Sequence, residues 1–101
     1  MVTTTHDDEA KARALAADVV RARLAACAQV YRIQSVYWWD GEVQDAAEWR
    51  IDFKTRVELA DMLAEFIGER HEYDTPEVIA VPVVAGSVAY LEWVRAETAQ
   101  G

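Results

Sequence analysis

The chain has 101 residues, 52% of them hydrophobic, and a formal net charge of -8. This length suits a single domain over residues 1–101. The acidic balance argues against nucleic-acid binding, which requires clustered Lys and Arg. The one cysteine, Cys27, excludes a disulfide within the chain and favours a reducing compartment. No apolar run reaches the roughly 20 residues of a membrane span, so we expect a cytoplasmic protein.

The first quarter of the chain predicts a short strand and a helix. Residues 2–5 are mostly β-branched and suit a strand. An Ala-rich segment at 10–24 has apolar residues at helical spacing. The acids after His6 suit the N-terminus of that helix. We therefore expect His6 to lie in a solvated helix start, with a metal ligand as the less favoured alternative.

The middle of the chain predicts a long β-hairpin. Strand-like runs at 28–39 and 42–55 flank Asp40-Gly41. This pair tolerates the positive φ angles of a type I′ turn. In the second run Trp49, Ile51 and Phe53 alternate with polar residues, so they should share one face. The aromatic tip of the hairpin requires a cover from the rest of the chain or from another subunit.

The last part of the chain predicts two helices and one strand. Residues 58–70 carry an apolar stripe typical of an amphipathic helix. A loop at 71–76 and a strand at 76–81 follow, with Pro82 marking the edge or the end of the strand. Gly86-Ser87 begins a final helix that carries Tyr90, Leu91, Trp93 and Val94.

This order of elements predicts an α+β fold of the ferredoxin-like βαββαβ type. Such a fold has an antiparallel sheet with two helices on one face, and here it gains an extra C-terminal helix. The central strands are longer than a sandwich of this size needs, so their tip should project from the domain. An exposed ribbon rich in aromatic residues indicates an oligomerisation arm.

Several phrases, in order along the chain, resemble one family. They are Leu-Ala-Ala-Cys at 24–27, Ser-Val-Tyr-Trp-Trp-Asp-Gly at 35–41, Glu48 with Lys54-Thr55, His71-x-Tyr73-x-x-Pro76-Glu77, and Tyr90-Leu91-x-Trp93. In this register the chain resembles the CutA family of divalent-cation tolerance proteins. The resemblance implies a ferredoxin-like fold, a tightly packed homotrimer, and a link to copper and other divalent metals. The chain departs from the family where His-Pro-Tyr becomes His71-Glu72-Tyr73, and its single cysteine cannot form a multi-cysteine site within one chain.

One group of residues is a candidate metal site. Imidazole suits copper(II), zinc and nickel, and carboxylates add charge and ligands, so we propose His71 with Glu72 or Asp74. Cys27 is an optional soft ligand. The alternatives are that His71 holds a neighbouring backbone, and that Cys27 packs as a small apolar residue. No metal-type spacing such as H-E-x-x-H is present.

A second group of residues is a candidate inter-subunit cleft. The resemblance suggests that these residues gather between subunits: Trp39, Glu48, Lys54, Tyr73, Tyr90 and Trp93. A lysine and a carboxylate edged by aromatic rings suit a small anionic ligand. The alternative is an aromatic trimer interface with an internal ion pair.

The sequence offers no catalytic motif, since it has neither a glycine-rich phosphate loop nor a G-x-S-x-G elbow. We therefore expect a binding protein and not an enzyme. The favoured function is a homotrimer that binds copper(II) or another divalent metal, which its folding does not require, and contributes to metal tolerance. The alternative is a trimeric regulatory module, similar in build to PII-type signalling proteins, that binds a small molecule or a partner protein in the cleft.

Overall fold

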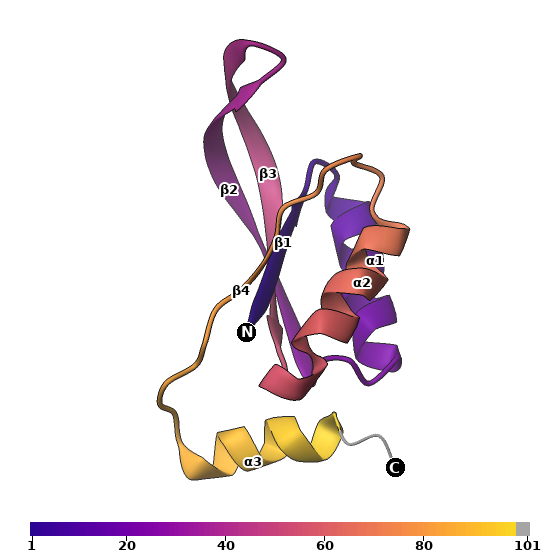
Figure 1. Ribbon diagram of the computed structural model, residues 1–101, viewed down its shortest axis with the longest axis vertical. Helices are drawn as coiled ribbons and strands as arrows, with labels where there is room; N and C mark the ends of the chain where they lie inside the picture. Colours follow the sequence, from indigo (N-terminus) through magenta and orange to yellow (C-terminus); the bar gives the residue numbers. More distant parts are fainter. Residues whose placement is uncertain (99–101) are drawn as a thin grey trace.

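The computed structural model describes residues 1–98 and contains a four-stranded antiparallel sheet with the strand order β2-β3-β1-β4. In chain order the elements are β1 (Val2–His6), α1 (Glu9–Arg21), β2 (Cys27–Trp39), β3 (Glu42–Lys54), the 3-10 turn η1 (Val57–Leu59), α2 (Ala60–Arg70), β4 (Val78–Ala80) and α3 (Val88–Glu97). Helices α1 and α2 cover one face of the sheet (Figure 1). This arrangement confirms the predicted ferredoxin-like fold with an added C-terminal helix.

The strands of the hairpin and β1 differ from the expected ranges by one residue, and three other elements differ by more. Helix α1 begins at Glu9 because the Asp8 side chain accepts a hydrogen bond from the Lys11 amide at 2.9 Å and caps the helix. The second amphipathic segment opens with η1 and becomes α-helical only at Ala60. Strand β4 is only three residues long, and each of its residues pairs with β1.

The core lies between the sheet and the two helices. Ile51 and Phe53 of β3 share one cluster with Leu63 and Ile67 of α2, and all four side chains are fully buried. Partly buried Trp49 packs against the same core. The predicted alternation along β3 is therefore correct. Within residues 1–98, no helix covers the other face of the sheet, which bears Glu48, Arg50 and Asp52.

The hairpin of β2 and β3 projects beyond the rest of the subunit (Figure 1). It pairs continuously from Cys27–Lys54 to Trp39–Glu42. At its tip Asp40 and Gly41 have φ angles of 51° and 75°, as a type I′ turn requires. The molecule measures 45 Å along its longest axis and 26 Å along the next. The predicted projecting ribbon is thus present.

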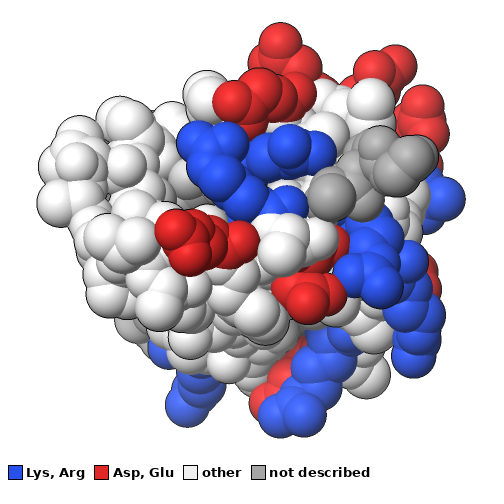
Figure 2. Space-filling model, turned by 90° about the horizontal axis from the view of Figure 1, so that it is seen from below, with Lys and Arg blue, Asp and Glu red and all other residues white. Residues whose placement is uncertain are grey.

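Helix α3 lies below the sheet (Figure 1), and two polar contacts tie its C-terminal end to the domain. Arg56 donates a hydrogen bond to the carbonyl of Thr98 at 2.8 Å, and Arg23 pairs with Glu97 at 2.7 Å. Figure 2 views this end of the molecule and shows a broad uncharged surface where Figure 1 places the chain before α3 and its first turns. The exposed apolar residues of this segment are Val81, Val83, Val84, Val88, Tyr90, Leu91 and Trp93.

Among the described residues 1–98, no helix combines the length and the apolar character needed to cross a membrane.

Candidate functional site

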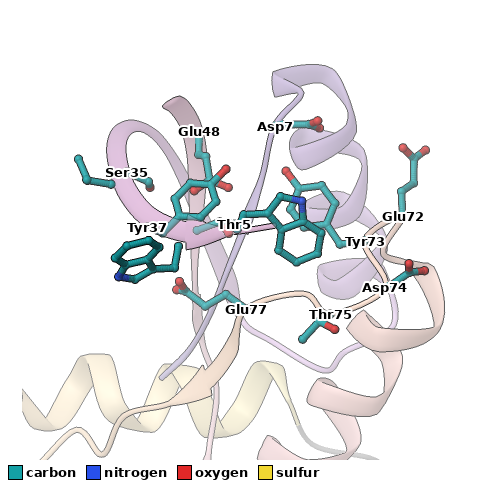
Figure 3. A pocket seen from close by; sticks show the side chains of 13 residues that line it. Thr5, Asp7, Ser35, Tyr37, Glu48, Glu72, Tyr73, Asp74, Thr75 and Glu77 are labelled. Atoms are coloured by element: carbon teal, nitrogen blue, oxygen red, sulfur yellow. The ribbon is translucent and has the colours of Figure 1, made fainter. Parts of the chain in front are cut away.

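A pocket of about 830 Å³ opens between the hairpin and the loop that follows α2 (Figure 3). β1 and β3 supply its floor, because Thr5 pairs with Arg50 and Glu48 lies two residues earlier on the same face. The lining comes from four segments of the chain. It consists of Thr5, Asp7, Ser35, Val36, Tyr37, Trp38, Trp39, Glu48, Glu72, Tyr73, Asp74, Thr75 and Glu77.

Every charged residue in the pocket lining is an acid. Five of the lining residues are carboxylates, and none is Lys, Arg or His; the acids are Asp7, Glu48, Glu72, Asp74 and Glu77. Two of them have cationic neighbours outside the lining: Glu72 pairs with Lys11 at 2.8 Å and Glu77 with Arg50 at 3.8 Å. Such a cavity attracts cations and repels anions.

Glu48 is the buried member of this acidic set. Its exposed fraction is 9%. Among residues 1–98, no side chain or amide donates a hydrogen bond to its carboxylate, and no cationic group lies within 4.0 Å of it. Its oxygens are not among the buried side-chain atoms that lack a partner, so the carboxylate is open to the pocket.

Tyr73 reports the electrostatics of the pocket. Burial, followed by the negative charges of Asp7 and Glu48, raises the pKa of the Tyr73 phenol from 10.0 to about 12. Both effects disfavour the phenolate, because it would be a further negative charge in a partly desolvated site. Tyr73 is thus a neutral hydroxyl at physiological pH.

The loop that carries Tyr73 is held by two histidine rings. His71 donates from Nε2 to the Thr5 carbonyl at 2.6 Å, since its Nδ1 accepts from the Tyr73 amide at 3.1 Å. Its ring stacks on His6, with 4.8 Å between centroids. His6 is 3% exposed at the end of β1. The expectation of a solvated His6 is therefore wrong, because the ring of His71, distant in sequence, covers it.

The four predicted metal ligands do not meet within one subunit. Glu72 and Asp74 line the pocket, whereas both nitrogens of His71 are engaged with backbone groups. Cys27 lies at the far end of β2, where its sulfur is 3.9 Å from the Tyr90 hydroxyl. Within residues 1–98 no group of three or more His, Cys, Asp or Glu side chains is placed to hold a metal ion.

The predicted cleft residues separate into two sets within the subunit. Trp39, Glu48 and Tyr73 line the pocket. The remaining three residues, Lys54, Tyr90 and Trp93, belong to the opposite end of the sheet and to α3. Lys54 lies six residues along β3 from Glu48, which is about 20 Å at roughly 3.3 Å per residue.

At the end of the sheet away from Glu48, Lys54 and Tyr90 contact residues other than those of the pocket. Lys54 donates to the Gln29 side chain at 2.6 Å, so it is not the partner of Glu48 in this subunit. The rings of Tyr90 and Trp93 lie 5.6 Å apart. Burial and the contact with the Cys27 thiol raise the pKa of Tyr90.

Asp52 forms a polar network on the open face of the sheet. It accepts hydrogen bonds from Thr3 at 2.6 Å and Tyr31 at 2.8 Å, and Arg50 lies 3.5 Å away. Burial alone raises the pKa of this carboxyl, but these three groups outweigh it and hold the pKa below its usual value. Arg50 and Lys54 are the two cations of the same strand face that could pair with Asp52, and only Arg50 does so, because Lys54 is bonded to Gln29.

Sequence reasoning missed several lining residues, among them Asp7, Tyr37 and Trp38. Asp7 looked like part of a helix start. The available signal was the alternation in the hairpin, which places Tyr37 and Trp39 on the face of β2 that continues the Glu48 face of β3.

Residues 1–97 match the family model described as "CutA1 divalent ion tolerance protein". The chain belongs to the CutA1 family. It is 42% identical over 99 residues to Protein CutA 1, chloroplastic, of Oryza sativa subsp. japonica, covering 97% of this chain and 56% of that protein. It is 38% identical over 97 residues to the divalent-cation tolerance protein CutA of Escherichia coli strain K12, covering 95% of this chain and 87% of that protein.

Solved CutA1 structures share the fold. CutA1 from Pyrococcus horikoshii matches with a TM-score of 0.93 and 33% identity, over 98% of this chain and 97% of that chain. CutA1 from Oryza sativa matches with a TM-score of 0.90 and 43% identity, over 99% of this chain and 93% of that chain. Against the plant and human CutA proteins, this chain spans about half of their length.

Proposed function

We propose that this CutA1-family protein binds copper(II) or a related divalent cation as a homotrimer and thereby contributes to metal-ion tolerance. Its action is binding and not turnover. The observation that carries the proposal is the acidic pocket, whose lining has five carboxylates and no basic side chain. The names of its relatives, which refer to divalent-cation tolerance, supply the biological context.

The loop carboxylates Glu72 and Asp74 are the proposed first ligands. They line the pocket and are exposed, and divalent cations accept carboxylate oxygens together with several waters. Since no three-ligand cluster exists within residues 1–98, water or a second subunit supplies the remaining ligands. His71 acts as a positioning residue, because its ring fixes the loop through Thr5 and Tyr73. The metal is not required for folding, and Cys27 remains a separate soft ligand.

The trimer is supported by the apolar surface of the subunit. Val36, Trp38 and Trp39 on the hairpin are at least 61% exposed, and Val88, Tyr90, Leu91 and Trp93 of α3 are exposed as well. Monomers rarely expose contiguous apolar surface on this scale. In a trimer, neighbouring subunits would cover the hairpin and α3 and so remove this apolar surface from water.

The trimer has a direct test. Light scattering should give a mass about three times the 11.4 kDa of the subunit. Trp38→Glu places a charge in the proposed interface and should lower the mass. Met62→Glu, on the exposed face of α2, is the matched control and should leave it unchanged. A wild-type mass of one subunit would contradict the proposal.

The metal site is tested by replacing both loop acids. The double variant Glu72→Gln with Asp74→Asn should weaken copper(II) binding at least tenfold by calorimetry. Glu42→Gln, an exposed acid on β3 outside the pocket, is the control. Electron paramagnetic resonance should show no imidazole nitrogen coupling to the bound copper, because His71 positions the loop. Such coupling, lost in His71→Ala, would make His71 a ligand instead.

A regulatory module that binds a small molecule is the second candidate function. The pocket volume of about 830 Å³ favours it, because small-molecule sites span roughly 300–1,000 Å³. A thermal-shift screen with metals and with small molecules separates the two candidate functions, since any ligand specific for the native state raises the stability of that state by mass action.

We place the protein in the cytoplasm as part of this proposal, because its single cysteine favours a reducing compartment.

A further inference from the structure

A second cavity, of about 280 Å³, lies on the helical side of the sheet. The end of β1 supplies His6, α1 supplies Lys11 and Asp18, and the end of α2 supplies Arg70. In Figure 1 the last turn of α2 lies beside α1, whereas the hairpin projects above the domain and α3 lies below it. No lining residue belongs to the hairpin or to α3. The cavity is therefore separate from the surfaces that neighbouring subunits would cover in the proposed trimer.

A buried imidazole forms part of the cavity lining. His6 shares the face of β1 that carries Val2 into the core under the helices, and it is 3% exposed. Its Nδ1 accepts a hydrogen bond from the Asp8 amide at 3.2 Å, so Nε2 carries the proton. The Asp7 carboxylate, 3.1 Å from Nδ1, can pair with it only in the doubly protonated ring, in which Nε2 also carries a proton.

The Nε2–H of His6 has no acceptor within the described residues. No hydrogen bond from this atom is formed among residues 1–98, and the atom is not one of the sealed side-chain atoms that lack a partner. His6 lines this cavity and not the larger pocket. The cavity thus offers a ligand a hydrogen-bond donor on a ring that is almost completely buried.

The charged residues around the cavity are of both signs. Lys11 and Glu72 pair with each other at 2.8 Å, which leaves Arg70 and Asp18. The ion pairs of these two residues, each with a neighbour on its own helix, are long, at 3.9 Å and 3.7 Å, and join exposed side chains. Such pairs contribute little stability. One cation and one anion therefore remain available to a ligand.

Arg70 is held in place by an aromatic ring. Its guanidinium carbon lies 3.5 Å from the centroid of the Phe66 ring. Stacking on a ring limits the freedom of the side chain and leaves the N–H groups of the guanidinium free to bind a carboxylate in bidentate fashion. Arg70 and the Nε2–H of His6 are thus two donors suited to one carboxylate.

The mixed charges select the class of ligand. A simple anion would meet the carboxylates of Asp18 and Glu72, and a simple cation would meet Lys11 and Arg70. Like charges placed together in a site oppose binding. A ligand with one carboxylate and one ammonium group satisfies both Arg70 and Asp18. A cavity of roughly 150 Å³ can hold benzene, so 280 Å³ has room for a ligand of amino-acid size.

We propose that the cavity between α1 and the end of α2 binds a small α-amino acid as its zwitterion. The ligand carboxylate accepts hydrogen bonds from His6 and Arg70, and the ligand ammonium group pairs with Asp18. Ala14 and Leu15, which also line the cavity, contact an apolar ligand side chain. This site goes beyond the divalent-cation function proposed above and does not depend on it.

The test is a calorimetric titration of the full chain, in metal-free buffer, with L-alanine, L-valine and L-leucine. Two analogues of each amino acid remove one charge, since the amide lacks the carboxylate and the deaminated acid lacks the ammonium group. We expect saturable binding of at least one amino acid and at least tenfold weaker binding of both its analogues. Absence of saturable binding by all three, or an analogue that binds within tenfold of its parent, overturns the proposal.

Two exposed side chains locate the ligand. Asp18→Asn and Arg70→Gln should each weaken binding of the same amino acid at least tenfold. Arg21→Gln and Glu69→Gln are the matched controls, because they break the surface ion pairs of Asp18 and Arg70 from outside the cavity. Both controls should bind like the wild type. Unchanged binding in the cavity variants, or an equal loss in their controls, overturns the proposal.

His6→Phe tests the buried donor. It keeps an aromatic ring against His71 but removes Nε2, so it should weaken amino-acid binding several-fold. Wild-type affinity in His6→Phe overturns the proposal. The Asp18 and Arg70 variants decide the case if His6→Phe does not fold.

The same measurements separate this site from the metal site. Asp18→Asn leaves Glu72 and Asp74 in place, so its copper(II) affinity should equal that of the wild type. A parallel fall in copper(II) and amino-acid affinity would place both ligands in one site and overturn the present proposal. The divalent-cation proposal fails on its own if the Glu72→Gln, Asp74→Asn double variant binds copper(II) normally.

Discussion

The ring of His6 stacks on the ring of His71, with 4.8 Å between their centroids and 24° between their planes. His6 ends β1, and His71 follows the last residue of α2. Tyr73 extends the stack, its ring centroid 4.5 Å from that of His71. This contact joins the sheet to the loop that forms one side of the pocket. The pocket therefore depends on a buried aromatic stack that one subunit supplies.

His71→Ala should lower the free energy of unfolding by about 1–3 kcal/mol, because it removes a ring contact and leaves the Thr5 carbonyl and the Tyr73 amide unpaired. Urea unfolding at fixed protein concentration measures this. Glu65→Gln, on the exposed face of α2, is the control. A His71→Ala midpoint equal to that of the control would show that the stack does not stabilise the fold.

Asp52→Asn should destabilise the protein by about 1–2 kcal/mol at neutral pH, since it weakens hydrogen bonds from Thr3 and Tyr31 to a charged group. The folded-state pKa of Asp52 lies below its ordinary value of 3.8. Its contribution is therefore present above about pH 4 and is lost as the pH falls through the lower folded-state value. Unfolding measured across this range should show the variant converging with the wild type in acid. A difference independent of pH would contradict this.

Tyr73 should ionise at a higher pH than an ordinary tyrosine, since its pKa is raised to about 12. Because this value exceeds the ordinary 10.0, the neutral phenol contributes stability below pH 10 that is lost as the pH rises through about 12. Ultraviolet titration of the phenolates measures the step. Tyr73→Phe should remove it, and Glu48→Gln should shift it to lower pH by removing a negative charge. A step that Glu48→Gln leaves in place would show that Glu48 exerts little field at Tyr73.

Two glycines should respond in opposite directions to alanine. A methyl group added at Gly41 or at Gly68 would meet no atom within 4 Å. The backbone conformation at each position therefore decides whether alanine stabilises or destabilises the protein. Gly41→Ala should cost about 1 kcal/mol, because Gly41 has a φ of 75° in the turn. Gly68→Ala should stabilise α2 by about 0.5–1 kcal/mol. Denaturant midpoints of the two variants test this, and a shift of the same sign in both would contradict it.

The hairpin was predictable because its information is local. Asp40-Gly41 specifies the turn, and the alternation of Trp49, Ile51 and Phe53 specifies which face is buried. The positions of His6 and Glu48 were not predictable in this way. His6 is buried by His71, from the other half of the chain, and the Asp-Asp-Glu sequence after it has the appearance of a helix start.

The candidate site was predicted in part for the same reason. Period two places Glu48 and Lys54 on one face of β3, but it does not reveal that the length of the strand keeps them apart. The pocket is formed where β1 and the loop after α2 approach the hairpin, which brings Asp7 and Asp74 into one lining. This approach depends on the strand order β2-β3-β1-β4 and not on any local pattern.

We propose that this CutA1-family protein binds a divalent cation as a trimer. A calorimetric titration with copper(II) at neutral pH, on protein whose mass in solution is measured by light scattering, tests both parts of this proposal. We predict saturable binding with an integral stoichiometry per subunit or per trimer, on a particle of three subunits. Heat no larger than that of an unrelated acidic protein of equal charge would contradict the account.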